Sequence, residues 1–328
     1  MTRLRLVTGP DDPAILEAAA ILALGGLVAF PTETVYGLGA DGLNPEAVAR
    51  IYAAKGRPAT NPVILHVADA SAAWALVSHW PAEAQALAER FWPGPLTLVL
   101  PASEAVPSIV RAGGPSVALR CPAHPVALAL IRAAGRPLAA PSANRSQHLS
   151  PTLAQHVASS LGEAVALILD GGPTEAGLES TILDLTGERP RILRPGPIGP
   201  ADLAALVGPV ERWEGAVPAG EMQAAPGMAE RHYAPRARLE LVAPGTGLAE
   251  GSGAAAYVGL GKLPALPAGV RGILLPLDAD AVGTRLYALL HELDDAGFDR
   301  IVMERPPEDD AWLAVRDRLW RASAKERP

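Results

Sequence analysis

The sequence predicts an α/β protein in two parts: a larger N-terminal domain with helices around a twisted mixed sheet, and a smaller C-terminal α/β domain of Rossmann-like character. Three observations predict this. Helix and strand patterns alternate through residues 1–207, the periodicity disappears over 211–235, and the alternation then resumes. A chain of 328 residues is also long enough for two domains. We therefore expect domains over 1–210 and 236–328, joined by a linker over 211–235.

The first elements are marked by helix start and stop signals. Asp12 opens an amphipathic helix that extends to about residue 24, where a Gly-Gly pair stops it, and a short buried strand follows over 27–30. The next helix has an N-cap at Asn44, followed by proline, and Gly56 is placed to end it. Both helices therefore have defined ends.

Strands and helices continue to alternate after this point. Strands are expected over 63–67, 96–100, 116–120, 165–169, 180–185 and 191–194, with helices over 81–91 and 125–134. In one of these strands, Ser116 and Arg120 share one face, while Val117 and Leu119 share the other. The apolar face belongs to the core, and the other face is directed at something polar.

The linker and the C-terminal part follow. The linker is rich in Gly, Pro and Ala and ends in the sequence RHYAP over 231–235. A linker does not need His232 and Tyr233, which either anchor it or fold back onto another surface. Beyond the linker, strands are expected over 239–242, 254–258, 272–275 and 299–302, and helices over 280–293 and 309–324.

The composition excludes several classes of protein. Hydrophobic residues make up 49% and charged residues 19%, and no apolar run reaches the roughly 18 residues that span a bilayer. The single cysteine, Cys121, excludes a disulfide framework and a cysteine-built zinc site, and we expect it in the core. The N-terminal residues show no secretion signal, so the cytoplasm is the expected compartment.

Charge gives no sign of a nucleic-acid-binding surface. The net charge is −7, with 14 basic and 17 acidic side chains in residues 1–210 and 14 and 18 in the remainder. A protein that grips phosphodiester backbones usually shows a basic domain or stripe. Any cationic site here must be local.

Lys55 is the first candidate site residue, because it is the only lysine in the first 261 residues of a chain that otherwise uses arginine. A compact ammonium differs from a planar guanidinium, so a lysine kept in this background indicates a specific need for it. The sequence KGRP over 55–58 follows the hydroxyl-rich run over 30–39 and precedes Asn61 and His66. These residue types together are typical of a site for a polyphosphate and a small polar substrate. The alternatives are a solvated surface lysine and a cation that complements the helix C-terminus.

Other catalytic and nucleotide-binding motifs are incomplete or absent. GLGADG over 37–42 matches the dinucleotide fingerprint, but no Asp or Glu lies between residues 46 and 69 to bind a ribose. The chain has no P-loop, no HExxH and no GxSxG motif. Ser142 and Asn144 therefore indicate a hydrogen-bonding loop without a covalent catalyst, with turn formation as the alternative for the asparagine.

A resemblance to a known family rests on several motifs together. They are FPTETVYGL over 30–38, KGRP over 55–58, NP over 61–62, WPGPLT over 92–97, PSAN over 141–144, EST over 179–181 and RPG over 194–196. In this order they resemble the YrdC family, and the resemblance covers nearly all of residues 10–207. The sequence HYAP and the domain that follows it are similar to the longer, two-domain members, which are threonylcarbamoyl-AMP synthases.

The resemblance implies a reaction. L-Threonine, bicarbonate and ATP give L-threonylcarbamoyladenylate and pyrophosphate, which is nucleotidyl transfer, and partner transferases use the product to modify an adenosine of tRNA. Mg²⁺ is implied on the ATP phosphates. The sequence shows no carboxylate cluster for it, so phosphates and hydroxyls would supply most of its ligands. Whether tRNA binds directly is left open.

The resemblance also implies roles for individual residues. Lys55 and Arg57 would be the catalytic cations. The ATP site would comprise Lys55, Arg57, Asn61, Ser116, Ser142, Asn144, Ser150, Arg194 and Tyr233. The threonine site would comprise Thr34, His66, Arg120, Ala140 and Ser180. Arg120 would grip the threonine carboxylate, and Tyr233 would close over the site to keep water from the labile intermediates.

Two alternatives remain. One is a tRNA- or double-stranded-RNA-binding module without catalysis, against which the even charge balance counts. The other is carbamoyl transfer in hydrogenase maturation, which uses a similar module. That route should bring cysteine-rich zinc modules, which one cysteine cannot provide.

Overall fold

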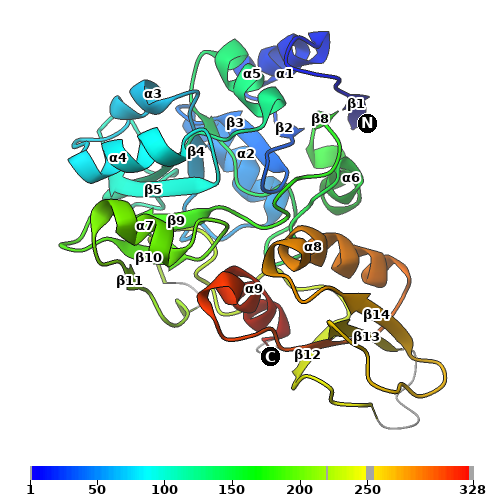
Figure 1. Ribbon diagram of the computed structural model, residues 1–328. Helices are drawn as coiled ribbons and strands as arrows, with labels where there is room; N and C mark the ends of the chain where they lie inside the picture. The colour runs from blue at the N-terminus through cyan, green and yellow to red at the C-terminus, as the bar shows by residue number, and fades with distance from the viewer. Residues whose placement is uncertain (1, 219–220, 249–254, 325–328) are drawn as a thin grey trace.

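The computed structural model describes residues 2–218, 221–248 and 255–324. It has a large N-terminal sheet and a small C-terminal sheet, each with its own helices (Figure 1). The small sheet is reached through a linker. The predicted combination of two α/β parts is confirmed.

The large sheet has eleven strands among the described residues. They are β1 (Arg3–Leu6), β2 (Val28–Phe30), β3 (Gly37–Asp41), β4 (Ile64–His66), β5 (Leu96–Pro101), β6 (Ser116–Arg120), β7 (Leu138–Ala139), β8 (Leu167–Asp170), β9 (Thr181–Asp184), β10 (Arg191–Arg194) and β11 (Glu211–Arg212). Their order is β1-β8-β2-β3-β7-β4-β6-β5-β9-β10-β11. β4 and β6 are parallel, whereas β5 and β6 are antiparallel, so the sheet is mixed, as predicted.

Helices cover this sheet. They are α1 (Pro13–Ala23), α2 (Pro45–Lys55), α3 (Ala70–Trp74), α4 (Ala82–Phe91), α5 (Pro125–Ala134), α6 (Ala154–Leu161) and α7 (Pro200–Val207). The ends of α2 are those the sequence predicts. The Asn44 side chain accepts from the backbone N–H groups of Glu46 and Ala47, and Gly56 ends the helix in the left-handed conformation at φ 60°. This stop fixes Lys55 as the last residue of α2.

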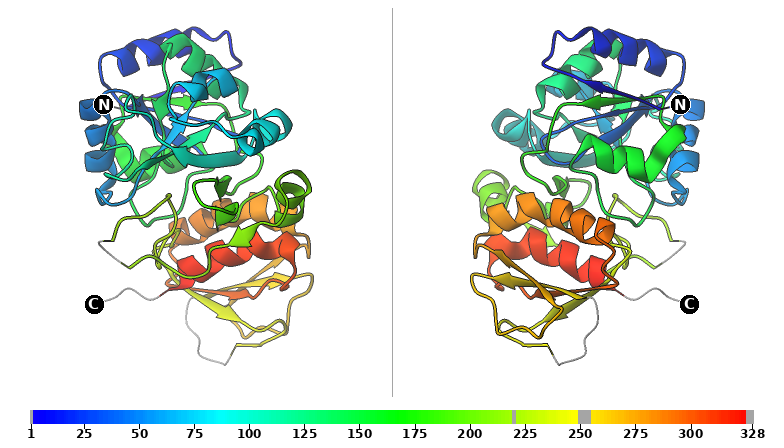
Figure 2. Two further views of the ribbon diagram at one scale, coloured as in Figure 1. Left: turned by 90° about the vertical axis from the view of Figure 1, so that its left-hand side faces the viewer. Right: turned by 90° about the vertical axis from the view of Figure 1, so that its right-hand side faces the viewer.

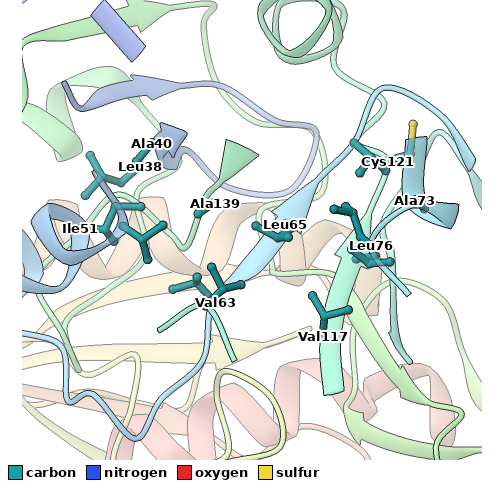
Figure 3. Close-up of a cluster of buried hydrophobic side chains, with 14 of the residues drawn as sticks. Leu38, Ala40, Ile51, Val63, Leu65, Ala73, Leu76, Val117, Cys121 and Ala139 are labelled. Carbon is teal, nitrogen blue, oxygen red and sulfur yellow. The ribbon is translucent and has the colours of Figure 1, made fainter. Parts of the chain in front are cut away.

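One core of the N-terminal domain lies between α2 and the sheet. Figure 3 shows Ile51 of α2 beside Leu38 and Ala139, with Leu65 and Val117 continuing the cluster. All five residues are buried. The apolar face of β6 therefore belongs to the core, as its alternation predicts.

Cys121 closes the far end of the same cluster (Figure 3). Its side chain is buried, and burial raises the pKa of the thiol to about 12. It is the small core residue that the sequence predicts.

Among the described residues, the small domain has four parallel strands in the order β12-β15-β13-β14. They are β12 (Arg238–Val242), β13 (Ala255–Leu260), β14 (Arg271–Leu275) and β15 (Arg300–Glu304), with helices α8 (Ala279–Asp295) and α9 (Leu313–Ser323). The parallel sheet confirms the Rossmann-like prediction. Residue 254 of the predicted strand over 254–258 lies outside the described residues. Both views in Figure 2 place α8 and α9 between the small sheet and the large domain.

The linker folds back onto the large domain. Ala225 and Met228 are buried in an apolar cluster with Ile64, Val99 and Ala118, on strands of the large sheet. The linker thus covers the second face of β6, opposite the core. Within the described ranges, none of the helices combines the length and the apolar character that crossing a bilayer requires.

Candidate active site

One cavity in the N-terminal domain collects segments that lie far apart in the sequence. Its lining comes from residues 32 and 34–37, from the loop that follows α2, from β4, β6 and β10, and from the linker. Among the predicted site residues, the lining contains Thr34, Arg57, His66, Arg120, Ala140, Ser142, Arg194 and Tyr233. The structure therefore brings members of the predicted threonine and ATP sites around one space.

Lys55 lies behind the lining of this cavity. Its Nζ donates to the carbonyl oxygen of Ser142 at 2.5 Å and to that of Asn144. Burial lowers the pKa of Lys55 well below its ordinary value, and the charge of Arg57 lowers it further. The ammonium holds the loop over 142–144 from behind, so it supports the cavity wall.

Arg57 is held by the loop that follows it. Its Nε donates to the Asn61 carbonyl at 2.9 Å, and its Nη2 donates to Asn61 Oδ1 at 2.5 Å and to the Pro62 carbonyl at 2.6 Å. Burial lowers the pKa of Arg57 to about 10, so the group still carries its charge at neutral pH. Asn61 therefore acts on the cavity through Arg57.

Arg194 supplies a second buried cation. Its Nε and Nη2 donate to the carbonyl and to the hydroxyl of Ser180, both at 3.1 Å. The Ser180 hydroxyl is also 2.8 Å from Thr97 Oγ1. Ser180 is thus placed behind Arg194 as its support.

Arg120 is the third cation and is paired with Glu33. The Nη2 atom of Arg120 lies 2.8 Å from Glu33 Oε1, and both side chains are buried. The contact is an ion pair and does not have the geometry of a hydrogen bond. Arg120 Nη2 and both Glu33 oxygens therefore have no hydrogen-bond partner among the described residues. Buried polar groups without partners point to a ligand that completes them.

His66 lies beside this pair. Burial lowers the pKa of His66 to about 3, and the charge of Arg120 contributes. The ring is therefore neutral, and its Nδ1 has no hydrogen-bond partner among the described residues. A neutral ring next to Arg120 can accept or donate a hydrogen bond without repelling that cation.

Glu179 joins the cavity to Ser150 and to the small domain. One carboxylate oxygen accepts from the Ser150 hydroxyl, and the other accepts from Arg318 Nε at 2.8 Å and from the Tyr287 hydroxyl at 3.1 Å. Burial by itself raises the pKa of the Glu179 carboxyl, but the charges of Arg318 and Arg194 outweigh it and lower the pKa to about 2. Glu179 is therefore ionised.

Tyr233 closes the cavity from the linker side. The side chain is buried, and its backbone is left-handed at φ 60°. The ring lies 4.0 Å from the His232 ring and 5.9 Å from the Tyr287 ring, measured between centroids. Of the two readings of the sequence RHYAP, the structure supports the one in which His232 and Tyr233 fold back onto another surface.

Ser116 lies apart from this group. It stands at the opposite end of β6 from Arg120 and pairs with Pro101. The described lining of the cavity does not include it.

The site suits anion binding. Arg57, Arg120 and Arg194 are all buried around the cavity, and hydroxyl and carbonyl groups surround them. Among the described residues no group of three His, Cys, Asp or Glu side chains is arranged to hold a metal ion. The arrangement offers positioning and positive charge. Cys121, which follows Arg120 in the sequence, has a buried thiol whose pKa is raised.

Sequence reasoning missed several residues of the site. Glu33 and Glu179 both lie inside the family motifs. Both are buried next to cations, and the sequence alone does not show this. Gly227 lines the cavity from the linker. The linker is rich in glycine, so the sequence does not distinguish this one as a site residue. Arg318 reaches Glu179 from 139 residues away, and no local pattern marks it.

Two family models match the chain. The Sua5/YciO/YrdC model, described as telomere recombination, matches residues 20–196. A model described as the C-terminal domain of threonylcarbamoyl-AMP synthase matches residues 198–324. Together they cover both parts of the structure.

Individual relatives agree with these matches. Threonylcarbamoyl-AMP synthase from Bacillus subtilis is 41% identical, over 95% of this chain and 94% of that protein, and the one from Pyrococcus abyssi is 42% identical, over 95% of both. The crystal structure of P. abyssi Sua5 complexed with L-threonine is similar with a TM-score of 0.88 at 39% identity, over 98% of this chain and 97% of that one. The chain therefore belongs to the Sua5/YciO/YrdC family, in the form that carries the second, C-terminal domain.

Proposed function

We propose that this chain is a threonylcarbamoyl-AMP synthase, a nucleotidyltransferase that joins L-threonine, bicarbonate and ATP into L-threonylcarbamoyladenylate with release of pyrophosphate. The observation that carries the proposal is the single cavity in which Arg120 and His66 face the same space as Arg57 and Arg194. Relatives of this name that match the chain over nearly its whole length support it. Its product would pass to the transferases that modify tRNA.

The chemistry needs substrates of like charge to be held together. The threonine amine and bicarbonate combine to a carbamate with loss of water. A carbamate oxygen then bonds to the α-phosphorus of ATP, and the bond from that phosphorus to the pyrophosphate oxygen breaks. The reaction needs no covalent attachment to the protein, so positioning and charge stabilisation are what the site must supply.

The cavity divides between the two substrates. Arg120 Nη2, which is ion-paired with Glu33 but has no hydrogen-bond partner among the described residues, suits the threonine carboxylate. His66 and Thr34 line the same cavity and suit the threonine hydroxyl. The Glu33 carboxylate, which likewise accepts no hydrogen bond within the described residues, suits the threonine amine before it becomes the carbamate. Arg57 and Arg194 suit the phosphates and the charge that develops on the departing pyrophosphate.

The loop over 142–144 would be the phosphate-side wall. Lys55 fixes its carbonyl oxygens from behind, and the Ser142 hydroxyl at the cavity is the group of this loop that suits the nucleotide. Pro226, Gly227 and Tyr233 of the linker would cover the substrates and exclude water.

Magnesium would arrive as part of MgATP. Glu179 lines the cavity, and Glu33 lies behind Arg120. Each carboxylate is paired with an arginine, so both are poor ligands for a resident metal ion. Phosphate oxygens, hydroxyls and water fit the oxygen ligands that Mg²⁺ prefers.

The test is pyrophosphate release from MgATP by the full chain, with threonine and bicarbonate omitted in turn, and mass analysis for the adenylate. We expect release that requires both co-substrates and a product with the mass of threonylcarbamoyladenylate. Release at the same rate without threonine would overturn the substrate assignment. RNA binding with no turnover of ATP would favour the non-catalytic alternative.

A further inference from the structure

The small domain inserts a charged side chain under the linker of the active site. Arg318 of α9 has no exposed surface and is one of the largest fully buried side chains among the described residues. Both views in Figure 2 show α9 on the side of the small domain that faces the large one. Burying an arginine in this way is costly unless its partners are well placed.

All of the described partners of Arg318 lie at or next to the cavity or on its own helix. Its Nε donates to Glu179 Oε2 at 2.8 Å and its Nη2 to the Glu179 carbonyl at 3.4 Å, while Nη1 donates to Asp317 Oδ2 at 2.7 Å. Its guanidinium carbon lies 5.0 Å from the centre of the Tyr233 ring. The edge of the guanidinium thus holds a cavity-lining carboxylate, and its face holds the linker tyrosine.

These two contacts determine the geometry on both sides of the cavity. Glu179 directly precedes Ser180, whose carbonyl and hydroxyl hold Arg194. The same carboxylate accepts from Ser150. A shift of Glu179 would therefore move Arg194, and a shift of the ring would open the cover provided by Tyr233.

A second arginine of α9 holds the linker just before Tyr233. Arg321 donates to the Ala229 carbonyl, and its own carbonyl accepts from the His232 N–H at 3.3 Å. Asp317 ties the two arginines together, because its oxygens accept from Arg318 at 2.7 Å and from Arg321 at 3.0 Å. The linker is fastened to α9 at several points around the residue that closes the cavity.

We propose that Arg318 is a positioning residue for adenylate formation, through which the C-terminal domain completes the active site. It acts through Tyr233 and Glu179 and does not touch the substrates. This inference rests on the proposed function. It assigns the small domain a part in the reaction, because this domain supplies the positioning side chain Arg318.

The test compares Arg318→Lys with Arg316→Lys in the full chain. Arg316 lies on the same helix, is half-buried and donates to the Pro307 carbonyl, away from the cavity. Lysine keeps the charge of Arg318 but not the planar edge and face. For Arg318→Lys we expect kcat of threonine-dependent pyrophosphate release to fall by roughly 10- to 100-fold, and the fraction of ATP hydrolysed without adenylate formation to rise. Arg316→Lys should behave as the unaltered protein.

A double-mutant cycle separates positioning from general destabilisation. Because Arg318 acts partly through Tyr233, adding Arg318→Lys to a Tyr233→Ala protein should reduce kcat by a clearly smaller factor than it does in the unaltered protein. Multiplying effects of the two changes would overturn the inference. Tyr287→Phe removes one hydrogen bond to Glu179 without removing a charge, so we expect a smaller fall in kcat than for Arg318→Lys. This variant tests the inference even if Arg318→Lys does not fold.

The two proposals fail differently. Absence of threonine-dependent release by the unaltered protein would overturn the proposed function and this inference with it. An active unaltered protein, with Arg318→Lys and Tyr287→Phe as active as Arg316→Lys, would overturn the inference alone.

Discussion

Lys55 places a single ammonium between two carbonyl oxygens of one loop. A point charge with rotatable donors fits between two such acceptors, whereas a planar guanidinium is longer and spreads its donors over a fork. The preference for lysine at this position in an arginine-using chain therefore has a local cause. The sequence predicted that the residue belongs to the site, but not that it acts on the cavity wall from behind, because that depends on a loop 87 residues away.

We expect Lys55→Arg to be only partly active. The fork cannot enter the space between the Ser142 and Asn144 carbonyls without moving the loop, because Lys55 is buried. Lys55→Ala should lower kcat/KM for ATP by roughly 10²-fold, the loss expected when active-site groups are misplaced by about 1 Å. Steady-state pyrophosphate release measures both.

Lys262→Arg is the matched control, because Lys262 is exposed and lies in the small domain. It should leave kcat/KM unchanged. Full activity of Lys55→Arg would contradict the account of this residue.

Arg120 allows a prediction about substrate preference. Arg120→Lys keeps a cation beside Glu33 but loses the forked donor that suits a carboxylate. Since a hydrogen bond to a charged group contributes about 1.5–3 kcal/mol, KM for threonine should rise by roughly 10-fold or more, with KM for ATP changed much less. Initial rates at varied concentrations of each substrate distinguish the two, and equal increases in both constants would count against the assignment.

At the scale of elements, periodicity predicted most helices and strands to within a few residues. The strand over 116–120 and the helix over 125–134 have the predicted bounds. The sequence does not mark β1, β7 and β11, which have four, two and two residues, because such short runs carry too little pattern.

The strand β3 was missed for another reason. It contains two glycines, which strand propensity disfavours, and the structure shows why they are there. A Cβ atom on Gly39 would lie 2.7 Å from Phe30 Cε1, on the paired strand β2. Glycine is therefore required inside a strand, where propensity alone argues against it.

Gly227 tests the linker as a structural element. A Cβ atom there would lie 2.5 Å from the Tyr233 hydroxyl and 2.9 Å from Arg194 Cδ, at a backbone φ of 87°. Gly227→Ala should therefore displace the tyrosine and the cation beside it. We expect kcat to fall about tenfold, which corresponds to about 1.4 kcal/mol of transition-state stabilisation.

Gly215→Ala is the control for Gly227→Ala. Gly215 also has a positive φ, but its Cβ position has no atom within 4 Å. It should reproduce the backbone strain without the collision. Equal losses of activity in the two variants would show that strain, and not the tyrosine, is responsible.

At the scale of the whole molecule, the sequence predicted two parts and a cavity in the first. It could not predict that the second part reaches that cavity, because Glu179 and Arg318 are 139 residues apart and no local pattern links them. Burial and pairing of charges are properties of the assembled fold. Glu33 and Glu179 became visible as site residues only when their cationic neighbours were known.

Stability should fall in acid. Burial lowers the pKa of His66 and of His156 to about 3, and His291 adds to the effect on His156. A histidine whose pKa is lowered on folding binds fewer protons in the native state, so it destabilises the native state as pH falls below about 6.5. The Glu179 carboxyl, with a pKa lowered to about 2, adds a further loss below about pH 4.5.

Urea unfolding between about pH 7.5 and 5 measures this effect. Each histidine that takes up a proton on unfolding should contribute a slope of up to about 1.4 kcal/mol per pH unit. His156→Phe keeps a ring against His291, 3.8 Å away between centroids, and should make the slope shallower. A free energy of unfolding that rises as the pH falls would contradict the sign.

The packing of Ala225 and Met228 against Ile64, Val99 and Ala118 has a thermal consequence. Contacts of this kind are driven near room temperature by the release of water from apolar surface, and their formation carries a negative heat-capacity change. They weaken on cooling. The apolar contacts that hold the linker over the cavity therefore stabilise it less at low temperature. Cooling should favour opening of the cavity to solvent over retention of bound substrates.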